Sequence, residues 1–344
     1  MSKSRNQLLN IVEAVATFLV VFIHFPFPGQ VGTITTAIAR ISVPFFFCVS
    51  GYFFYKENST KEASSIPRKI KRLLLLIIFS ELTYYLFYAA LQIQNVGFSL
   101  RAFANVIISE VVNRYVANWY EYIFVFAPPI NGICWFIGSL IVVYAVICPI
   151  VKYGYQKMAL IVSVVLLFAG MLLRRILVWT GVQTIFPYER LLPFLPFPFF
   201  VVGYHLRKYK AFCDKIDNKI YCAMLLAGIV LTVAESFTGV HTLYVGTLLL
   251  VFVAIAFCGK YSQYEVRTHI GKLFSHIGSS TATYIYILHM MIGNVLFVLV
   301  PRILTINANH WLYQWGIPIM ICISSALAAE FVVAVKRILC LKRR

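Results

Sequence analysis

Apolar runs of membrane-spanning length alternate with short polar stretches along almost the whole chain. An α-helix needs about 20 predominantly apolar residues to cross a bilayer, and ten runs of the sequence approach or exceed that length. They cover residues 7–25, 33–55, 71–94, 132–151, 157–179, 190–206, 219–237, 240–258, 278–300 and 311–335. The pattern predicts an all-α fold: a polytopic membrane bundle of about ten transmembrane helices, in a single domain over residues 1–344.

Residues 95–131 form the one long stretch that interrupts this pattern. Here Arg101 and Glu110 stand close to Phe103 and Ile107. A mixture of charged and large apolar side chains is typical of an amphipathic segment at a membrane surface. We therefore expect 95–131 to be an extracytoplasmic segment that lies on the membrane or covers a cavity, and we expect no fused soluble domain.

The lysine positions predict how the helices are oriented. All fifteen lysines lie in the two tails or in and around the polar stretches 56–70, 152–157, 207–219 and 259–277. Cytoplasmic loops of membrane proteins carry an excess of lysine and arginine. Ten spans with both termini in the cytoplasm place all of these stretches on the cytoplasmic side.

The composition agrees with a membrane protein and excludes other classes. Hydrophobic residues make up 61% of the chain and charged residues 12%, against about 45–50% and about 25% in soluble domains. An ordinary soluble enzyme, a disordered chain and a disulfide-rich secreted module are therefore excluded. The net charge of +18 does not indicate nucleic acid as a partner, because the basic residues separate apolar runs instead of clustering on one soluble face.

The eight cysteines show no pattern of their own. Most lie inside apolar runs, where cysteine behaves as a small hydrophobic residue. The sequence contains no CxxC or CxxH pair, so we expect neither a metal site nor a disulfide framework.

The first apolar run carries two ionisable residues, Glu13 and His24. An ionisable group at membrane depth is costly and usually faces a protein interior or a wet cavity. Asn10, Glu13, Thr17 and His24 share one side of the helix, and the sequence FPFPG ends it after His24. His24 is therefore a candidate catalytic group, because the imidazole is the side chain whose ordinary pKa lies near neutral pH. The structural alternative is that Glu13 and His24 only bond neighbouring helices.

The second run contains Arg40, with Pro44 predicted to kink the helix. Ser50 and Gly51 leave a smooth surface that another backbone or a ligand can approach. Arg40 is a candidate functional residue, and the alternative is a structural pair with a carboxylate such as Glu13.

A basic cluster, Arg68, Lys69, Lys71 and Arg72, precedes the third run. Such a cluster is a common topology signal. It is also what the phosphates of a nucleotide require, and both interpretations stay open.

Five later residues complete the candidate site. Trp135 is an interfacial anchor or lines a groove for an acceptor, and Glu189 and Arg190 lie at the outer mouth of a proline-rich run. Irregular backbone at such prolines is tolerated where it lines a cavity. His289 lies in the middle of the ninth run with Tyr286 nearby, as a functional or a structural histidine.

Several of these stretches resemble the acyltransferase-3 family of integral membrane O-acyltransferases. The resemblance is carried by the polar first run that ends in His24, by ARISVPFFFCVSGYFF and RKIKR, and by the later WFIGSL and SSTATYIYILH. It implies transfer of an acetyl or similar short acyl group from cytoplasmic acyl-coenzyme A to a hydroxyl of a cell-envelope or extracellular carbohydrate. It also implies a multi-pass protein of the bacterial cytoplasmic membrane.

The resemblance assigns roles to the candidate residues. It implies that His24 is the general base or the acyl carrier, in a catalytic group that we extend to Glu13, Arg40 and His289. Acetyl-coenzyme A binding is expected at Ser50, Gly51, Tyr52, Arg68, Lys69, Lys71 and Arg72. Acceptor binding is expected at Trp135, Glu189, Arg190 and Tyr286.

One position departs from the family pattern. The family usually has an arginine eleven residues before the histidine, where this chain has Glu13. A glutamate repels phosphates, so Arg40 or Arg72 would have to replace that arginine, or the donor differs.

Two other functions fit the same pattern. A transporter could bind a small amino acid-like zwitterion at Glu13, Arg40, Glu235 and Glu330. A non-catalytic partner of a polysaccharide-export system needs no site at all. The sequence specifies neither the acceptor, nor the length of the acyl group, nor the oligomeric state.

Overall fold

The computed structural model describes residues 6–181, 190–239, 241–304, 307 and 309–341. Helices make up most of the described residues, which include no strand. The all-α prediction is confirmed.

Within the described residues, eight of the ten predicted spans correspond to helices that are long and apolar enough to cross a membrane. These are Gln7–His24, Gly29–Phe54, Ser59–Gln94, Gly132–Lys152, Gln156–Trp179, Asn218–Ser236, His269–Pro301 and Trp311–Leu339. The predicted spans 190–206 and 240–258 overlap the shorter helices α9 (Pro196–Lys208) and α12 (Val245–Lys260). The chain is thus a multi-pass membrane protein, while ten spans and cytoplasmic termini stay predictions.

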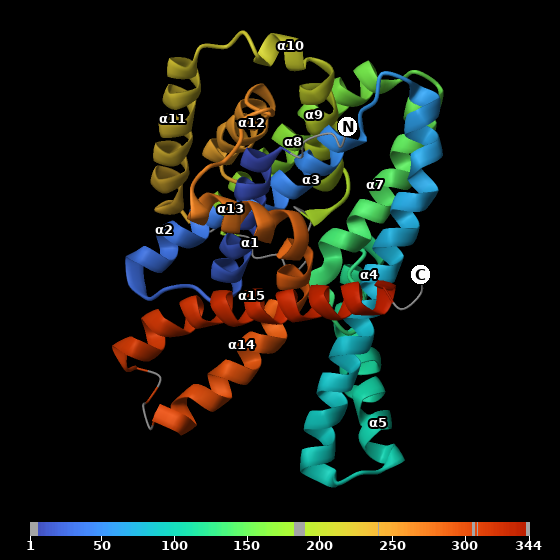
Figure 1. Ribbon diagram of the computed structural model, residues 1–344, viewed down its shortest axis with the longest axis vertical. Helices are drawn as coiled ribbons and strands as arrows, with labels where there is room; N and C mark the ends of the chain where they lie inside the picture. The colour runs from blue at the N-terminus through green and yellow to red at the C-terminus, as the bar shows by residue number, and fades with distance from the viewer. Residues whose placement is uncertain (1–5, 182–189, 240, 305–306, 308, 342–344) are drawn as a thin grey trace. The chain divides into compact units, whose positions relative to one another are not determined.

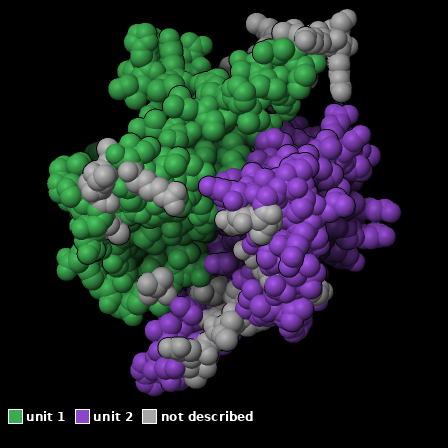
Figure 2. Space-filling view, turned by 90° about the horizontal axis from the view of Figure 1, so that it is seen from below, with its two compact units in different colours: residues 1–49, 209–344 green, residues 50–208 purple. Residues whose placement is uncertain are grey.

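The chain divides into two compact units, shown in different colours in Figure 2. Unit 1 comprises residues 1–49 and 209–344, and unit 2 comprises residues 50–208. The division falls inside helix α3 (Ser42–Phe54) and again after α9.

Unit 1 is organised around the first helix, α1. It includes all of α12 and the first part of α3. Its other helices are α1 (Gln7–His24), α2 (Gly29–Ala39), α10 (Lys210–Cys213), α11 (Asn218–Ser236), α13 (His269–His276), π-helix η4 (Ile277–Thr281), α14 (Ala282–Leu304) and α15 (Trp311–Leu341). Helix α1 packs against α2, α12, α13, η4, α14 and α15, and α11 pairs with α12 as α14 does with α15 (Figure 1).

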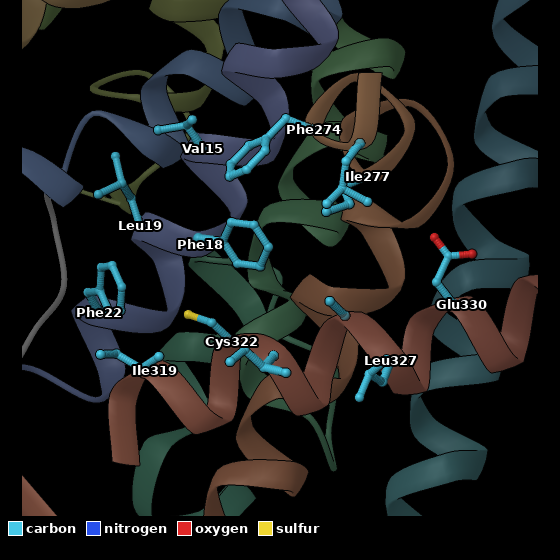
Figure 3. A pocket seen from close by; sticks show the side chains of 13 residues that line it. Val15, Phe18, Leu19, Phe22, Phe274, Ile277, Ile319, Cys322, Leu327 and Glu330 are labelled. Carbon is cyan, nitrogen blue, oxygen red and sulfur yellow. The ribbon is translucent and has the colours of Figure 1, made fainter. Parts of the chain in front are cut away.

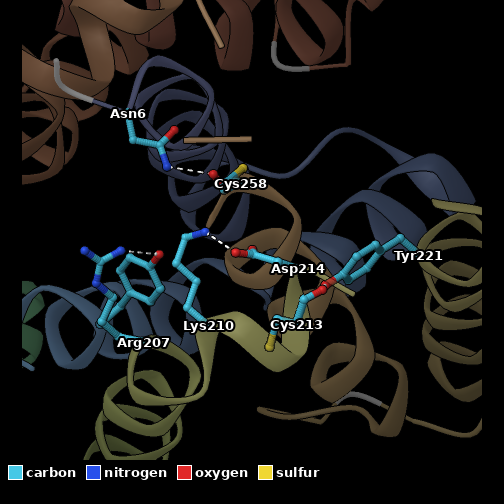
Figure 4. A network of polar contacts seen from close by, with 8 residues as sticks. Asn6, Arg207, Lys210, Cys213, Asp214, Tyr221 and Cys258 are labelled. Atoms are coloured by element: carbon cyan, nitrogen blue, oxygen red, sulfur yellow. Dashed lines mark hydrogen bonds and ion pairs between the residues drawn. The ribbon is translucent and has the colours of Figure 1, made fainter. Parts of the chain in front are cut away.

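The two ends of α1 follow from local sequence. Asn6 caps the first turn, because its side chain accepts a hydrogen bond from the Leu9 backbone N–H at 3.1 Å. The Asn6 Nδ2 also donates to the Cys258 carbonyl at 2.7 Å, which ties this end to α12 (Figure 4). Pro26 and Pro28 prevent the helix from continuing beyond His24.

The second predicted span is broken into two helices, where the sequence predicted only a kink. Helix α2 ends at Ala39 and α3 begins at Ser42, with Arg40 and Ile41 in a turn between them. Pro44 explains the position of the break, because a proline lacks an N–H and its ring crowds the carbonyl four residues earlier.

Unit 2 contains the helices α4 (Ser59–Val96), α7 (Trp135–Lys152), α8 (Gln156–Trp179) and α9, and a series of short helices between α4 and α7. The short helices are α5 (Leu100–Val106), π-helix η1 (Ile107–Asn113), α6 (Arg114–Phe124) and 3₁₀-helix η2 (Gly132–Cys134), and the unit also includes the end of α3. Helix α4 packs against α7 and α5, and α9 packs against α7 and α8.

Helix α4 starts earlier than the sequence predicts. We treated 56–70 as a polar loop, which is wrong from Ser59 onwards, where the chain is helical. Asn58 caps this helix by accepting from the Thr60 and Lys61 N–H groups at 2.9 and 3.3 Å. The basic cluster therefore lies on a helix in line with the apolar span.

The stretch 95–131 does not form a span of its own. Helix α5 returns along the end of α4 (Figure 1), and η1 and α6 follow it. Ile108, Val116 and Trp119 are exposed, as expected of an amphipathic segment whose apolar side faces lipid. Its side of the membrane and its action as a lid stay predictions.

A small polar network holds α10 in unit 1. The Lys210 Nζ and Asp214 Oδ2 form an ion pair at 2.6 Å, and the Tyr221 hydroxyl donates to the Cys213 carbonyl at 2.9 Å (Figure 4). Burial, and secondarily the Asp214 carboxylate, raise the pKa of the Cys213 thiol. This cysteine is therefore a packing residue rather than a nucleophile.

Candidate functional site

The structure brings two of the predicted catalytic residues together in unit 1. His24 is the last residue of α1 and is exposed, whereas His289 lies on α14 and is fully buried. Their ring centroids are 5.4 Å apart with an interplanar angle of 42°. One imidazole thus faces outward from the unit while its neighbour lies in the protein interior.

The hydrogen bond of His289 defines its tautomer. Its Nδ1 lies 2.7 Å from the Tyr286 carbonyl oxygen, and a carbonyl can only accept, so Nδ1 carries the proton. Nε2 then has a free lone pair in the neutral ring. This nitrogen is buried and has no hydrogen-bond partner within the described chain. A buried polar atom without a partner is unusual and points to a functional role.

Phe25 fixes the end of α1 against α14. It belongs to a buried cluster with Val21, Val300 and Ile317. Its ring lies 6.4 Å from that of His289 in an edge-to-face arrangement. The residue after His24 is therefore anchored in the core, which limits the positions that the His24 ring can reach. Tyr286, a predicted acceptor-binding residue, is buried with its ring 6.1 Å from that of His289.

The polar side of α1 is largely used in helix packing. Asn10 Nδ2 donates to Ser275 Oγ at 3.3 Å, and the Thr17 hydroxyl donates to the Glu13 carbonyl at 2.7 Å. Asn10 and Thr17 are both buried. Glu13 itself is half-buried and lies within electrostatic range of Cys258. The stripe between Asn10 and Thr17 therefore contributes to the packing of unit 1.

Gly278 in η4 allows the closest approach to α1. A Cβ at this position would overlap the Asn10 backbone carbonyl. We predict that Gly278→Ala destabilises the protein by about 1–3 kcal/mol, the usual cost of overpacking. The measurement is the thermal unfolding midpoint of the purified protein in detergent.

Gly316→Ala on α15 is the matched control for this prediction. A Cβ at position 316 meets no atom within 4 Å, and alanine favours a helix more than glycine does. Its midpoint should stay unchanged or rise. Equal midpoints in the two variants would contradict the packing role of Gly278.

Arg40 and Gly51 lie at backbone features of the second span. Arg40 is the C-cap residue of α2, at the break before α3. In unit 2, a Cβ on Gly51 would overlap the Phe200 carbonyl, so Gly51 lets α3 pack closely on α9. Ser50 precedes it and is half-buried. Gly51 thus has a packing role in the structure. That Ser50 and Gly51 also bind the donor stays a prediction.

A cluster of cations and tyrosines forms at one end of unit 2. The Arg207 Nη1 donates to the Tyr52 hydroxyl at 3.1 Å, and its guanidinium lies 5.2 Å from the centre of that ring (Figure 4). Lys69 Nζ lies 5.4 Å from the centre of the Tyr144 ring. Arg72 lies within electrostatic range of Lys69 and Tyr144. Tyr52, Lys69 and Arg72 were predicted to bind the donor, and the structure adds Arg207.

Glu62 is a buried carboxylate on the first turns of α4, the helix that also carries Lys69 and Arg72. Its side chain is 1% exposed and accepts from the Lys56 backbone N–H at 2.7 Å and from the Tyr204 hydroxyl at 3.3 Å. Lys208 lies within electrostatic range of the same carboxylate. Glu62 therefore ties the segments before α4 and at the end of α9 to each other. Arg68 and Lys71 are exposed on α4 and remain predicted phosphate ligands.

Trp135 and Arg190 form a second pair in unit 2. The Arg190 guanidinium lies 5.5 Å from the centre of the Trp135 ring, a distance at which a cation is attracted to the aromatic face. Both were predicted to bind the acceptor. Glu189, the third residue of that prediction, lies outside the described residues.

A carboxylate of α4 positions the start of α7. Glu81 accepts hydrogen bonds from the backbone N–H groups of Ile130 and Asn131 at 2.8 and 2.9 Å. The Asn131 Nδ2 in turn donates to Ser80 Oγ at 2.9 Å. These contacts fix the turn that leads to Trp135.

The residues that the sequence interpretation missed share a simple property. Arg207 and Tyr144 lie far along the chain from Tyr52 and Lys69, which they contact, and Glu62 lies far from Tyr204. Arg207 could have been noticed as a cation at the end of a proline-rich span, but nothing in the sequence pairs it with Tyr52.

The comparisons with known proteins agree with the earlier resemblance. A model of the acyltransferase-3 family, described as an acyltransferase domain, matches residues 6–329. No curated protein and no solved structure matches the chain.

Proposed function

This chain belongs to the acyltransferase-3 family, and from that premise we propose that it is a membrane O-acyltransferase. It moves an acetyl or similar short acyl group from cytoplasmic acyl-coenzyme A to a hydroxyl of a cell-envelope or extracellular carbohydrate. The proposed location is the bacterial cytoplasmic membrane. The pair formed by His24 and His289 is the observation that supports this proposal most directly.

In this proposal His24 acts on the acceptor hydroxyl. The hydroxyl oxygen attacks the thioester carbonyl, His24 takes the hydroxyl proton, the C–S bond breaks, and the proton passes to the coenzyme A sulfur. A general base of this kind contributes about 10²–10⁴-fold to a rate. The alternative route, in which His24 first accepts the acyl group, uses the same neutral imidazole.

His289 supports His24 in either route. Its unpartnered Nε2 is a hydrogen-bond acceptor in the neutral ring. We assign to it the stabilisation of the positive charge that His24 acquires when it takes a proton. Tyr286 holds His289 in the required tautomer through its backbone carbonyl, as second partners of functional histidines commonly do.

The cation and tyrosine cluster of unit 2 is the proposed donor site. Lys69, Arg72 and Arg207 supply charge for the phosphates of coenzyme A, and guanidinium groups bind phosphate in a bidentate way. Glu13 is unfavourable for a phosphate, so in this proposal the donor phosphates bind the cations of the cluster instead of Glu13. Trp135 with Arg190 is the proposed acceptor platform, because an indole face suits a sugar ring.

The proposal is tested with wild-type protein in nanodiscs and radiolabelled acetyl-coenzyme A. We expect saturable binding and a slow hydrolysis of the thioester in the absence of an acceptor. No binding by the wild type would contradict the proposal. Binding that appears only in Glu13→Arg would show that the donor site of this chain has diverged and would favour a transporter or a non-catalytic partner.

A further inference from the structure

Two glutamates of the membrane helices differ in their surroundings. Glu330 lines an open apolar cavity of about 560 Å³ between α1, the α13–η4 segment and α15 in unit 1 (Figure 3), and its side chain is 42% exposed beside His276. Glu62 of unit 2 is 1% exposed. Burying a carboxylate is costly unless hydrogen bonds and nearby cations replace the water that it loses. The contacts of Glu62 are therefore the ones that indicate a specific role.

The Glu62 carboxylate joins two segments of unit 2. Its Oε1 accepts a hydrogen bond from the Lys56 backbone N–H at 2.7 Å, and its Oε2 accepts one from the Tyr204 hydroxyl at 3.3 Å. The charges of Lys56 and Lys208 lie within electrostatic range of the carboxylate. Each carboxylate oxygen thus binds a different segment, one the residues before α4 and the other α9.

Tyr204 is the residue through which Glu62 contacts α9. It is buried, and its ring lies 5.1 Å from that of Tyr55 in an edge-to-face arrangement. On the side of α3, a Cβ at Gly51 would lie 3.0 Å from the Tyr204 backbone nitrogen, so the two helices are in close contact there. This turn of α9 is therefore held by α3, by Tyr55 and by Glu62.

Arg207 lies on the next turn of α9. It follows Tyr204 by three residues, which places it about 4.5 Å further along the axis and on nearly the same side of the helix. Its Nη1 donates to the Tyr52 hydroxyl at 3.1 Å (Figure 4). A guanidinium has five N–H groups, so an arginine bound through one of them can still bind a phosphate through two others. Because both residues lie on one helix, a displacement of Tyr204 also displaces Arg207.

A simpler role for Glu62 concerns α4 alone. Glu62 lies in the first turn of this helix, where a negative charge is favourable. That role requires no contact with Tyr204, which lies 142 residues further along the chain. The two roles therefore predict different results for a substitution that removes only the Tyr204 hydroxyl.

We propose that Glu62 is a positioning residue of the donor site. Through Tyr204 it holds Arg207 where the guanidinium binds a phosphate of coenzyme A. This inference rests on the proposed function and adds to it a residue that touches neither substrate. Loss of the bond between Glu62 and Tyr204 should weaken the binding of a donor that carries phosphates and leave the transfer step unchanged.

Tyr204→Phe tests this inference, because it removes the hydroxyl and keeps the ring. The KM and kcat of the protein in nanodiscs are measured from the release of labelled acetate. We expect the KM for acetyl-coenzyme A to rise about two- to tenfold, the change that the loss of one hydrogen bond produces, at an unchanged kcat. With acetyl-pantetheine, which lacks the phosphates, the KM should equal that of the wild type. Glu62→Ala should show the same pattern.

A double substitution distinguishes positioning from general destabilisation. In an Arg207→Ala background, Tyr204→Phe should raise the KM no further, because the cation that it positions is absent. Tyr84→Phe is the matched control, since Tyr84 is a buried tyrosine on α4, about six turns from Glu62. It should have the KM of the wild type with both donors.

Three outcomes would overturn the inference. They are a wild-type KM for acetyl-coenzyme A in Tyr204→Phe, an equal loss with both donors, and a loss that adds in full to that of Arg207→Ala. Tyr204→Phe decides the question alone if Glu62→Ala does not fold. Absence of both binding and hydrolysis of acetyl-coenzyme A by the wild type would overturn the proposed function, and this inference with it.

Discussion

Replacing His24 with alanine is expected to reduce acyl transfer by about 10²–10⁴-fold, the usual contribution of a general acid or base. The side chain is exposed at the end of α1, and Phe25 rather than His24 anchors this end in the core. The variant should therefore fold and bind acetyl-coenzyme A like the wild type. The measurement is the rate of release of labelled acetate or of transfer to an acceptor, at saturating donor.

His269→Ala is the matched control, because His269 is an exposed histidine at the start of α13. It should retain wild-type turnover. A double variant of His24 and His289 should be no slower than His24→Ala alone, since residues that act as a unit give non-additive losses. Retained turnover in His24→Ala, with unchanged thermal stability, would refute the assignment of His24 as base or acyl carrier.

The helices of this protein could be predicted from hydropathy because a bilayer imposes one length and one composition on every span. Span 7–25 agrees closely with α1, since Asn6 and the prolines after His24 specify both of its ends locally. The break at Arg40 was underestimated as a kink. A proline inside an apolar run shows where a helix weakens, but whether it bends or stops depends on neighbouring helices, which the sequence does not show.

The start of α4 was missed for a different reason. Residues 59–70 are polar and carry no apolar run, so hydropathy treats them as a loop. Their helical state depends on the Asn58 cap and on the burial of Glu62 against Tyr204, which lies 142 residues further along the chain. A contact of that kind has no local signature.

The same distinction applies to the candidate site. His24 and His289 were each recognised as ionisable groups within apolar runs, but their proximity follows from the packing of α14 on α1. Gly51 was interpreted as a place where another backbone or a ligand approaches, and the structure has the Phe200 backbone there. Small residues in membrane helices serve both purposes, and only the neighbouring chain distinguishes between them.

The second large effect concerns Arg72, which is exposed in the cluster of unit 2. Arg72→Ala should raise the KM for acetyl-coenzyme A about 10–100-fold, because a hydrogen bond to a charged group contributes about 1.5–3 kcal/mol. The kcat should change little, since the phosphates do not take part in the chemistry and their binding is the same in ground and transition states. Added salt should reduce the difference between variant and wild type, because it screens exposed charges.

Acetyl-pantetheine, which carries the thioester but lacks the nucleotide and its phosphates, separates phosphate binding from other effects of the Arg72 substitution. With this donor the wild type and Arg72→Ala should have the same KM. Lys61→Ala is the matched control, since Lys61 is an exposed cation on the first turn of the same helix and should behave as the wild type with both donors. An equal loss with acetyl-pantetheine would place Arg72 outside the phosphate site, and the charge that compensates for Glu13 would then have to come from Lys69, Arg207 or Arg40.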